Sequence, residues 1–121
     1  MRSHEESHAY QLAAEVRRRV QQLVKRPAFS REFDLARQIS RSSHSACANM
    51  AEGLSRFHDG DHARFLEVAR ASLSETIEHL TAAVERGYLE RTEMQAVAVL
   101  CRRSRGACTQ WILYLDSKRP R

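Results

Sequence analysis

The sequence predicts an all-α fold, an antiparallel up-down-up-down four-helix bundle that forms a single domain over residues 1–121. Apolar residues recur at steps of three and four along four long segments, which is the spacing of amphipathic helices, and no segment alternates as a strand does. The chain has only four glycines and two prolines, so the links between helices are short, and short links place neighbouring helices antiparallel.

The first two predicted helices are separated by a proline. The first covers residues 5–26, and Pro27 ends it because the residue before a proline avoids the α region. The second runs to Arg56 from Ser30, whose hydroxyl can cap the first turn. Both segments carry one apolar stripe, so each helix is expected to bury one face.

The third and fourth predicted helices are bounded by turn and cap signals. Residues 57–61 form an expected turn with capping aspartates, and Gly87 is the expected left-handed C-cap of the third helix. Thr92 and Gln95 fit a capping box for the fourth helix. The basic tail, about residues 117–121, is expected to be flexible.

The charge of the chain is basic and unevenly placed. Lys and Arg number 20 against 15 Asp and Glu, a net charge of +5, yet residues 58–87 are mainly acidic. Helices packed side by side would then present one basic and one acidic face, and a basic face attracts nucleic-acid phosphates. A solvated face without a ligand is the alternative. The candidate nucleic-acid-binding residues are Arg17, Arg18, Arg19, Arg102, Arg103, Arg105, Lys118 and Arg119.

A polar stripe interrupts the apolar pattern of the second helix. Its members step by 4, 4, 3 and 4, so they share one face: Arg41, Ser45, Asn49, Glu52 and Arg56. The third helix carries a second polar stripe with Ser72, Glu75 and His79. The stripes either contact a ligand or lock helices or subunits together. We favour the lock, with Arg41–Glu75 or Glu52–Arg70 as the expected ion pair.

Catalytic and cofactor motifs are missing from the sequence. It has no nucleophile elbow and no phosphate-binding glycine loop, so we expect a non-enzymatic protein with no cofactor. The stretch from His58 to His62 has metal-ligand residue types, but aspartate and glycine there favour a capping turn. A di-iron site would need more than the one Glu-x-x-His motif, Glu5 to His8. Sequence-specific base reading is not expected either, because no helix-turn-helix is evident and aromatics are only 7%.

Cysteine and apolar patterns bear on the compartment. Cys47, Cys101 and Cys108 form no CxxC pair and are expected to be reduced core residues. No apolar run is long enough to cross a bilayer, and residues 1–6 are too polar for a signal peptide. We therefore expect a cytoplasmic protein with no membrane association.

Two blocks of sequence carry a resemblance to a known family. The first is Arg41, Ser45, Asn49-Met50-Ala51-Glu52-Gly53 and Arg56; the second is Phe65-Leu66, Ala69-Arg70, Ser72-Leu73 and Glu75, followed by Gly87-Tyr88-Leu89. In this order, the span from Phe29 to Leu89 resembles the four-helix-bundle family encoded by intervening sequences of bacterial 23S rRNA genes. That family is related to the accessory proteins of diversity-generating retroelements. The sequence departs from the family pattern at Cys47, commonly a proline, at Ala71, commonly a glycine, and at His58, frequently Ser or Thr.

The resemblance implies a cytosolic bundle that assembles into a ring-like homopentamer. The related retroelement proteins are pentamers that bind nucleic acid and a reverse transcriptase. The resulting hypothesis is a non-enzymatic homopentamer that binds RNA or DNA phosphates without strong sequence preference. The alternative is a ring-forming scaffold that binds a protein partner and has no direct role with nucleic acid.

Overall fold

The computed structural model describes residues 4–118 of the chain, and the side chains of residues 8–29 and 31–118. It contains four long helices: α1 (His4–Leu23), α2 (Phe33–Leu54), α3 (Asp59–Glu85) and α4 (Arg91–Ser117). A short 3-10 helix, η1 (Pro27–Arg31), joins α1 to α2. No strand occurs within residues 4–118, so the predicted all-α class is confirmed.

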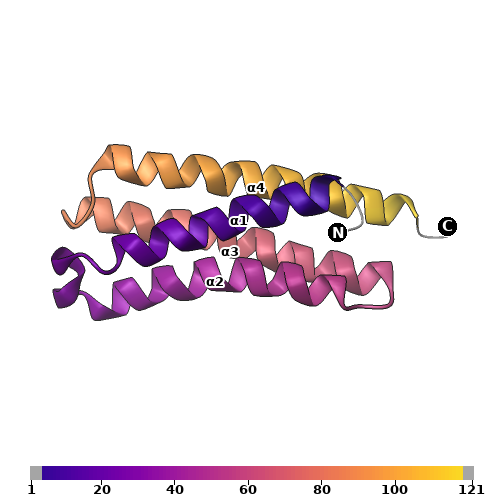
Figure 1. The fold of residues 1–121 in the computed structure, drawn as a ribbon, viewed down its shortest axis with the longest axis horizontal. Coiled ribbons are helices and arrows are strands. Elements are labelled where there is room, and N and C mark those ends of the chain that lie inside the picture. The colour runs from indigo at the N-terminus through magenta and orange to yellow at the C-terminus, as the bar shows by residue number, and fades with distance from the viewer. Residues whose placement is uncertain (1–3, 119–121) are drawn as a thin grey trace.

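Consecutive helices run antiparallel and form a closed ring of neighbours. Each helix packs against the next along the chain, and α4 packs against α1. The α1–α2 and α3–α4 links lie at one end of the bundle and the α2–α3 link at the other (Figure 1). The up-down-up-down topology predicted from the short links is therefore confirmed.

Apolar residues from all four helices fill the centre of the bundle. Val16, Ile39, Leu73 and Trp111 are all fully buried, and each lies on or beside an apolar stripe expected from the sequence. A buried side chain of this size contributes about 1.5–3 kcal/mol relative to an exposed one, so the core holds the helices together. None of the helices within the described residues is long and apolar enough to span a membrane.

The link between α1 and α2 differs from the prediction. α1 ends at Leu23, and Arg26 adopts an extended backbone (φ −66°, ψ 145°) before Pro27. Proline cannot continue α1, but its fixed φ suits the start of a new turn, and η1 begins there. The predicted N-cap at Ser30 is wrong, because that residue lies inside η1 and the N-cap of α2 is Glu32.

The link between α3 and α4 contains one correct and one incorrect cap prediction. Gly87 has a φ of 81°, and hydrogen bonds from Gly87 N to Val84 O (3.0 Å) and from Tyr88 N to Ala83 O (2.9 Å) close a Schellman motif. The capping box lies at Glu90 and Glu93, not at the predicted Thr92 and Gln95.

Burial explains the position of this capping box. Leu89 and Met94 are both buried, and they flank the first turn at the positions of a hydrophobic staple. Glu90, which lies between Leu89 and the first helical residue, is therefore the N-cap. Its backbone N–H donates to Oε1 of Glu93 at 3.1 Å.

The remaining helix ends lie close to their predicted positions. α2 ends at Leu54 and passes through Cys47 without a break. α3 begins at Asp59, inside the predicted turn of residues 57–61, and its N-cap is His58 without a side-chain hydrogen bond, so the predicted capping by the aspartates is wrong. Asp59 and Asp61 instead lie in the first turn of α3, where carboxylates interact favourably with the helix dipole. Of the predicted flexible tail, residue 117 still belongs to α4, and residues 119–121 lie outside the described residues.

Candidate functional site

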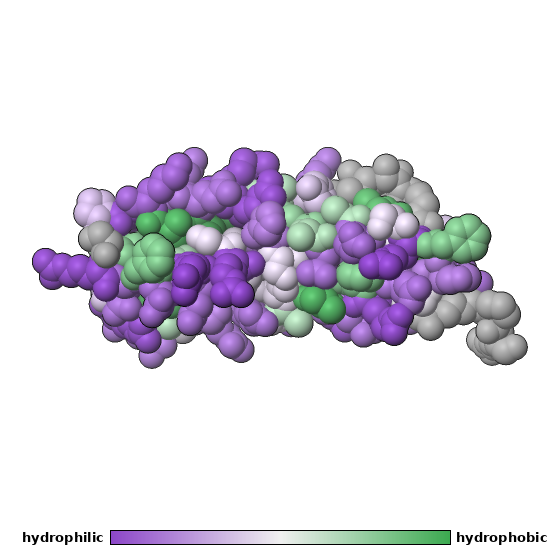
Figure 2. Space-filling view, turned by 90° about the horizontal axis from the view of Figure 1, so that it is seen from below, coloured by the Kyte–Doolittle hydropathy of each residue, from purple (hydrophilic) through white to green (hydrophobic). Residues whose placement is uncertain are grey.

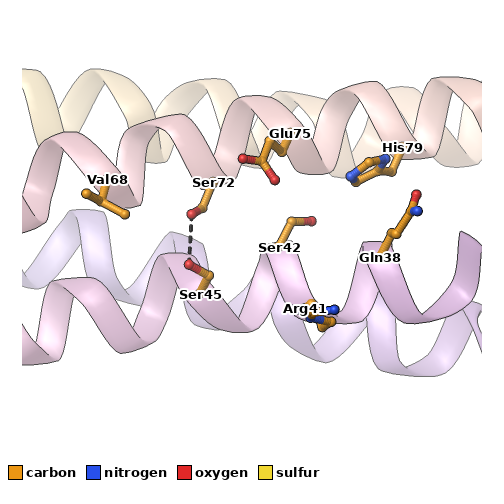
Figure 3. Close-up of a pocket in the computed structure, with 8 residues that line it drawn as sticks. All are labelled: Gln38, Arg41, Ser42, Ser45, Val68, Ser72, Glu75 and His79. Carbon is orange, nitrogen blue, oxygen red and sulfur yellow. Dashed lines mark hydrogen bonds between the residues drawn. The ribbon is translucent and has the colours of Figure 1, made fainter. Parts of the chain in front are cut away.

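A groove lies between α2 and α3, and two members of the α2 polar stripe, Arg41 and Ser45, line it (Figure 3). The groove has a volume of about 350 Å³. It is lined by Gln38, Arg41, Ser42 and Ser45 from α2, and by Val68, Ser72, Glu75 and His79 from α3. The two stripes singled out in the sequence thus meet here.

Two pairs of hydroxyl groups join the helices along this groove. Ser45 Oγ lies 2.9 Å from Ser72 Oγ, and Ser42 Oγ lies 2.8 Å from Thr76 Oγ1 (the first pair is dashed in Figure 3). Thr76 also donates to the carbonyl of Ser72 at 2.9 Å. Ser42 and Thr76 do not belong to the predicted polar stripes, although a polar residue among apolar core positions is a signal visible in the sequence.

Asn49 supports the groove from within its own helix. Its Nδ2 donates to the carbonyl of Ser45 at 2.8 Å and to Ser45 Oγ at 3.0 Å. The amide therefore orients the Ser45 hydroxyl toward α3 and does not itself reach across. Asn49 therefore contributes to the α2–α3 contact only through Ser45.

Both predicted ion pairs between the stripes are wrong. Glu52 pairs with Arg56 on its own helix at 2.8 Å, and Arg70 donates instead to Thr109 of α4. Arg41 and Glu75 form no ion pair in the part of the chain that the structure describes, and Figure 3 shows them apart on opposite walls.

Solvent exposure explains why these pairs do not form. Arg41, Glu52 and Glu75 are exposed, whereas Arg70 is half-buried and is held by its hydrogen bond to Thr109. Water therefore solvates the three exposed charges, and no burial cost forces a partner on them. Arg56 nevertheless contacts α3, because its guanidinium lies 4.5 Å from the centroid of the Phe65 ring.

The arginines of α1 do not form an open basic surface. Arg18 and Arg19 each donate from Nε to Glu15 at 3.0 Å, and these hydrogen bonds lower the pKa of Glu15. Arg17 is half-buried and lies near Cys47 of α2; its Nε is buried without a hydrogen-bond partner among the described residues. Glu15 therefore neutralises part of the predicted basic stretch.

Two of the three predicted arginines of α4 line a different groove, whereas Arg103 is exposed and is not among its lining residues. Arg102 and Arg105 line a groove of about 450 Å³ between α3 and α4, together with Arg70, Gly106 and Thr109. The structure thus brings Arg70, which we had assigned to the interface, to the candidate nucleic-acid-binding residues. It does not place Arg17, Arg18 or Arg19 in this groove, so the predicted single basic face is divided between two sides of the bundle.

The C-terminal basic residues are only partly described. Lys118 lies 3.7 Å from a carboxylate oxygen of Asp59 and 5.2 Å from the centroid of the Tyr114 ring. Arg119, also predicted to bind nucleic acid, lies outside the described residues. Lys118 therefore joins the end of α4 to the start of α3.

The histidines and cysteines occupy separate places in the fold. His58 is exposed, whereas His62 is buried and packs edge-on against Trp111 with ring centroids 4.8 Å apart. The described residues contain no group of three His, Cys, Asp or Glu side chains arranged to hold a metal ion. Burial raises the pKa of Cys101 and of Cys108 to about 12, so neither thiol is a ready nucleophile.

One solved structure with the same fold is a protein of unknown function from the S23 ribosomal protein family of Bacteroides thetaiotaomicron. It aligns with a TM-score of 0.83 and 20% identity, over 90% of this chain and 98% of that chain. No curated protein matches the chain. The model of the 23S rRNA-intervening sequence protein family matches residues 5–108, which is most of the bundle, and the chain therefore belongs to this family.

Proposed function

We propose that this protein is a non-enzymatic, cytoplasmic homopentamer that binds RNA or DNA phosphates without strong sequence preference. The observation that carries the proposal is a set of three arginines on α4, Arg102, Arg103 and Arg105. They form no ion pair with any residue that the structure describes, whereas Arg18, Arg19 and six other basic residues do. Their charge is therefore available to a polyanion.

Phosphate contacts at these arginines release counterions from the nucleic acid, which favours binding at low salt. Each contact alone is weak. A pentamer repeats the patch on every subunit, and linked weak contacts give a higher overall affinity. Contacts to the phosphate backbone fix the position of a protein on nucleic acid but do not read its sequence. Binding through these arginines would therefore show little sequence preference.

Fluorescence anisotropy with a labelled single-stranded RNA tests the proposal. Binding should weaken steeply between about 50 mM and about 200 mM salt, because log K falls with log salt in proportion to the phosphates contacted. A second RNA of equal length and different sequence is the control, and its affinity should agree within about threefold. A DNA strand of the same length compares the two nucleic acids.

Absence of binding at low salt would contradict the proposal and favour the protein-binding scaffold. Exposed aromatic side chains support that second candidate: Phe57 is 95% exposed in the α2–α3 link, and Phe33 is 69% exposed at the start of α2. Hydrophilic side chains cover most of the face in Figure 2, and hydrophobic ones are scattered between them along its length. Such isolated apolar groups can anchor a partner protein.

A further inference from the structure

We infer that the groove between α3 and α4 is a phosphodiester-binding site in which Arg70, Arg102 and Arg105 bind backbone oxygens and Thr109 positions Arg70. This inference rests on the proposed function, because it names the place where that function would act. The five residues of the groove are Arg70, Arg102, Arg105, Gly106 and Thr109.

The charges of its lining residues distinguish this groove from the other three grooves described below. Its lining contains three arginines and no carboxylate. The α2–α3 groove includes Glu75, the α1–α4 groove includes Glu93, and the groove at the start of α3 includes Asp61 and Glu67. A carboxylate repels a phosphate and competes for the guanidinium, so the α3–α4 groove is the one of these four that is suited to an anion.

Thr109 holds the Arg70 side chain across the groove. Its Oγ1 accepts a hydrogen bond from Arg70 Nη1 at 3.1 Å and donates to the carbonyl of Arg105 at 3.1 Å. The bond to the Arg105 carbonyl fixes the Thr109 hydroxyl on α4. The bond from Arg70 then holds the Arg70 guanidinium of α3 against that hydroxyl. A guanidinium has five N–H donors, so Arg70 keeps donors for a phosphate while losing little side-chain freedom on binding.

Arg105 contributes a donor that the fold leaves unused. The side chain is half-buried, and its Nε is shielded from solvent without a hydrogen-bond partner among the described residues. A buried donor without a partner costs free energy, so a rotation of the guanidinium that brings Nε to an acceptor in the groove is favourable. Phosphate oxygens are acceptors of the required charge.

Gly106 supplies an independent observation. A Cβ built at this position would meet no atom within 4 Å outside its own helix backbone, among the residues described. Packing therefore does not require glycine here, although glycine in a helix interior costs about 1 kcal/mol relative to alanine. The missing side chain keeps the groove open between Arg102 and Arg105 and lets a ligand backbone approach α4.

Charge-changing variants test the site in the RNA anisotropy assay. Arg70→Ala, Arg102→Ala and Arg105→Ala should each weaken binding about five- to tenfold at low salt and reduce the salt slope by about one contact. Arg37→Ala is the matched control, because it removes an equal charge from an exposed position of α2. Its affinity should stay within about twofold of the unchanged protein.

Three variants keep the charge and separate the positioning of Arg70 and the shape of the groove from electrostatics. Thr109→Val should weaken RNA binding about threefold without shifting Tm by more than about 2 °C, and Thr109→Ser should restore it. Gly106→Leu should block binding by filling the groove while the helix remains folded. Suppose that RNA binding depends on salt, but Arg102→Ala weakens it no more than Arg37→Ala does and Thr109→Val does not change it. That result would overturn this site and leave the proposed function standing. A protein that binds no RNA at low salt would overturn both.

Discussion

At the scale of single residues, Gly53 sets how closely α2 approaches α3. A Cβ at this position would lie 2.7 Å from Cδ2 of His62 and 3.3 Å from Cβ of Phe65. The His62 ring cannot easily move away, because it is buried and packs against the fully buried Trp111. The glycine of the Asn49–Gly53 motif is thus required by packing between helices.

Replacing this glycine should destabilise the bundle. Gly53→Ala is expected to lower the free energy of unfolding by about 1–3 kcal/mol, because an added methyl group overpacks the contact with His62. Urea denaturation followed by circular dichroism measures it. Gly106→Ala is the control and should be neutral or up to about 1 kcal/mol stabilising, since space is open there. Equal stability of Gly53→Ala and the unchanged protein would refute the close-contact explanation.

The sequence correctly predicted which faces of α2 and α3 carry polar side chains, but not which side chains bond to each other. Helical spacing correctly placed Ser45 and Ser72 on facing sides of α2 and α3. It could not show that Glu52 and Arg70 bond elsewhere, because spacing fixes the face of a side chain but not its exposure. Exposed charges have water as an alternative partner, so their pairing depends on three-dimensional detail.

At the scale of elements, the helices were more predictable than their ends. The apolar stripes identified all four helices, since core burial depends on periodicity over many turns. The helix caps depended on single residues, and a competing signal changed the N-cap at the start of both α2 and α4. At α2, Pro27 starts a separate 3-10 helix that contains Ser30, so Ser30 cannot be the N-cap. At α4, Leu89 is buried and the capping box lies at Glu90.

The ion pair between Arg26 and Glu93 joins the end of α1 to the start of α4. Hydrogen bonds from Arg26 and from the Glu90 backbone lower the pKa of Glu93 below its ordinary value of 4.5. The folded state therefore favours the ionised carboxylate. Its stabilising effect is complete above about pH 4.5 and is lost as pH falls through the lowered pKa of the folded protein.

The pH dependence of Glu93→Gln tests this link. Near neutral pH, Glu93→Gln should melt a few degrees below the unchanged protein, about 2–4 °C. The difference should shrink as pH falls below about 4.5, because protonation removes the charge from Glu93 in the unchanged protein. Thermal melts at a series of pH values measure it. Glu78→Gln is the control, because it removes an exposed carboxylate from α3, away from this capping box. A difference in Tm that stays constant down to acid pH would contradict the assignment.

At the scale of the whole molecule, the distribution of charge differs from the linear sequence. The chain predicts basic ends and an acidic middle, yet Arg70 of the acidic third helix joins Arg102 and Arg105 in one groove. Meanwhile Glu15 binds two arginines of the basic first helix. Local pairing therefore leaves a smaller basic surface than the net charge of +5 suggests, and no count of charges along the sequence could locate it.

The last prediction concerns assembly through the α2–α3 groove. Asn49 is half-buried, and its Nδ2 bonds only within α2. Its Oδ1 accepts no hydrogen bond from the described residues, so the amide still has an acceptor for a second subunit. If the proposed pentamer uses this face, Asn49→Leu should weaken self-association about tenfold, or about 1.4 kcal/mol, while the isolated bundle remains folded.

Light scattering over a range of protein concentrations measures this effect. The unchanged protein should have the mass of five copies of the 13.9 kDa chain, and Asn49→Leu should dissociate at about tenfold higher concentration. Gln21→Leu is the matched control, because it makes the same kind of polar-to-apolar change at an exposed position of α1. Its mass should not change. If Asn49→Leu retains both the mass and the Tm of the unchanged protein, Asn49 is neither a subunit contact nor a part of the helix lock. The Ser45–Ser72 and Ser42–Thr76 pairs would then hold α2 to α3 without Asn49, and the pentamer would need another face.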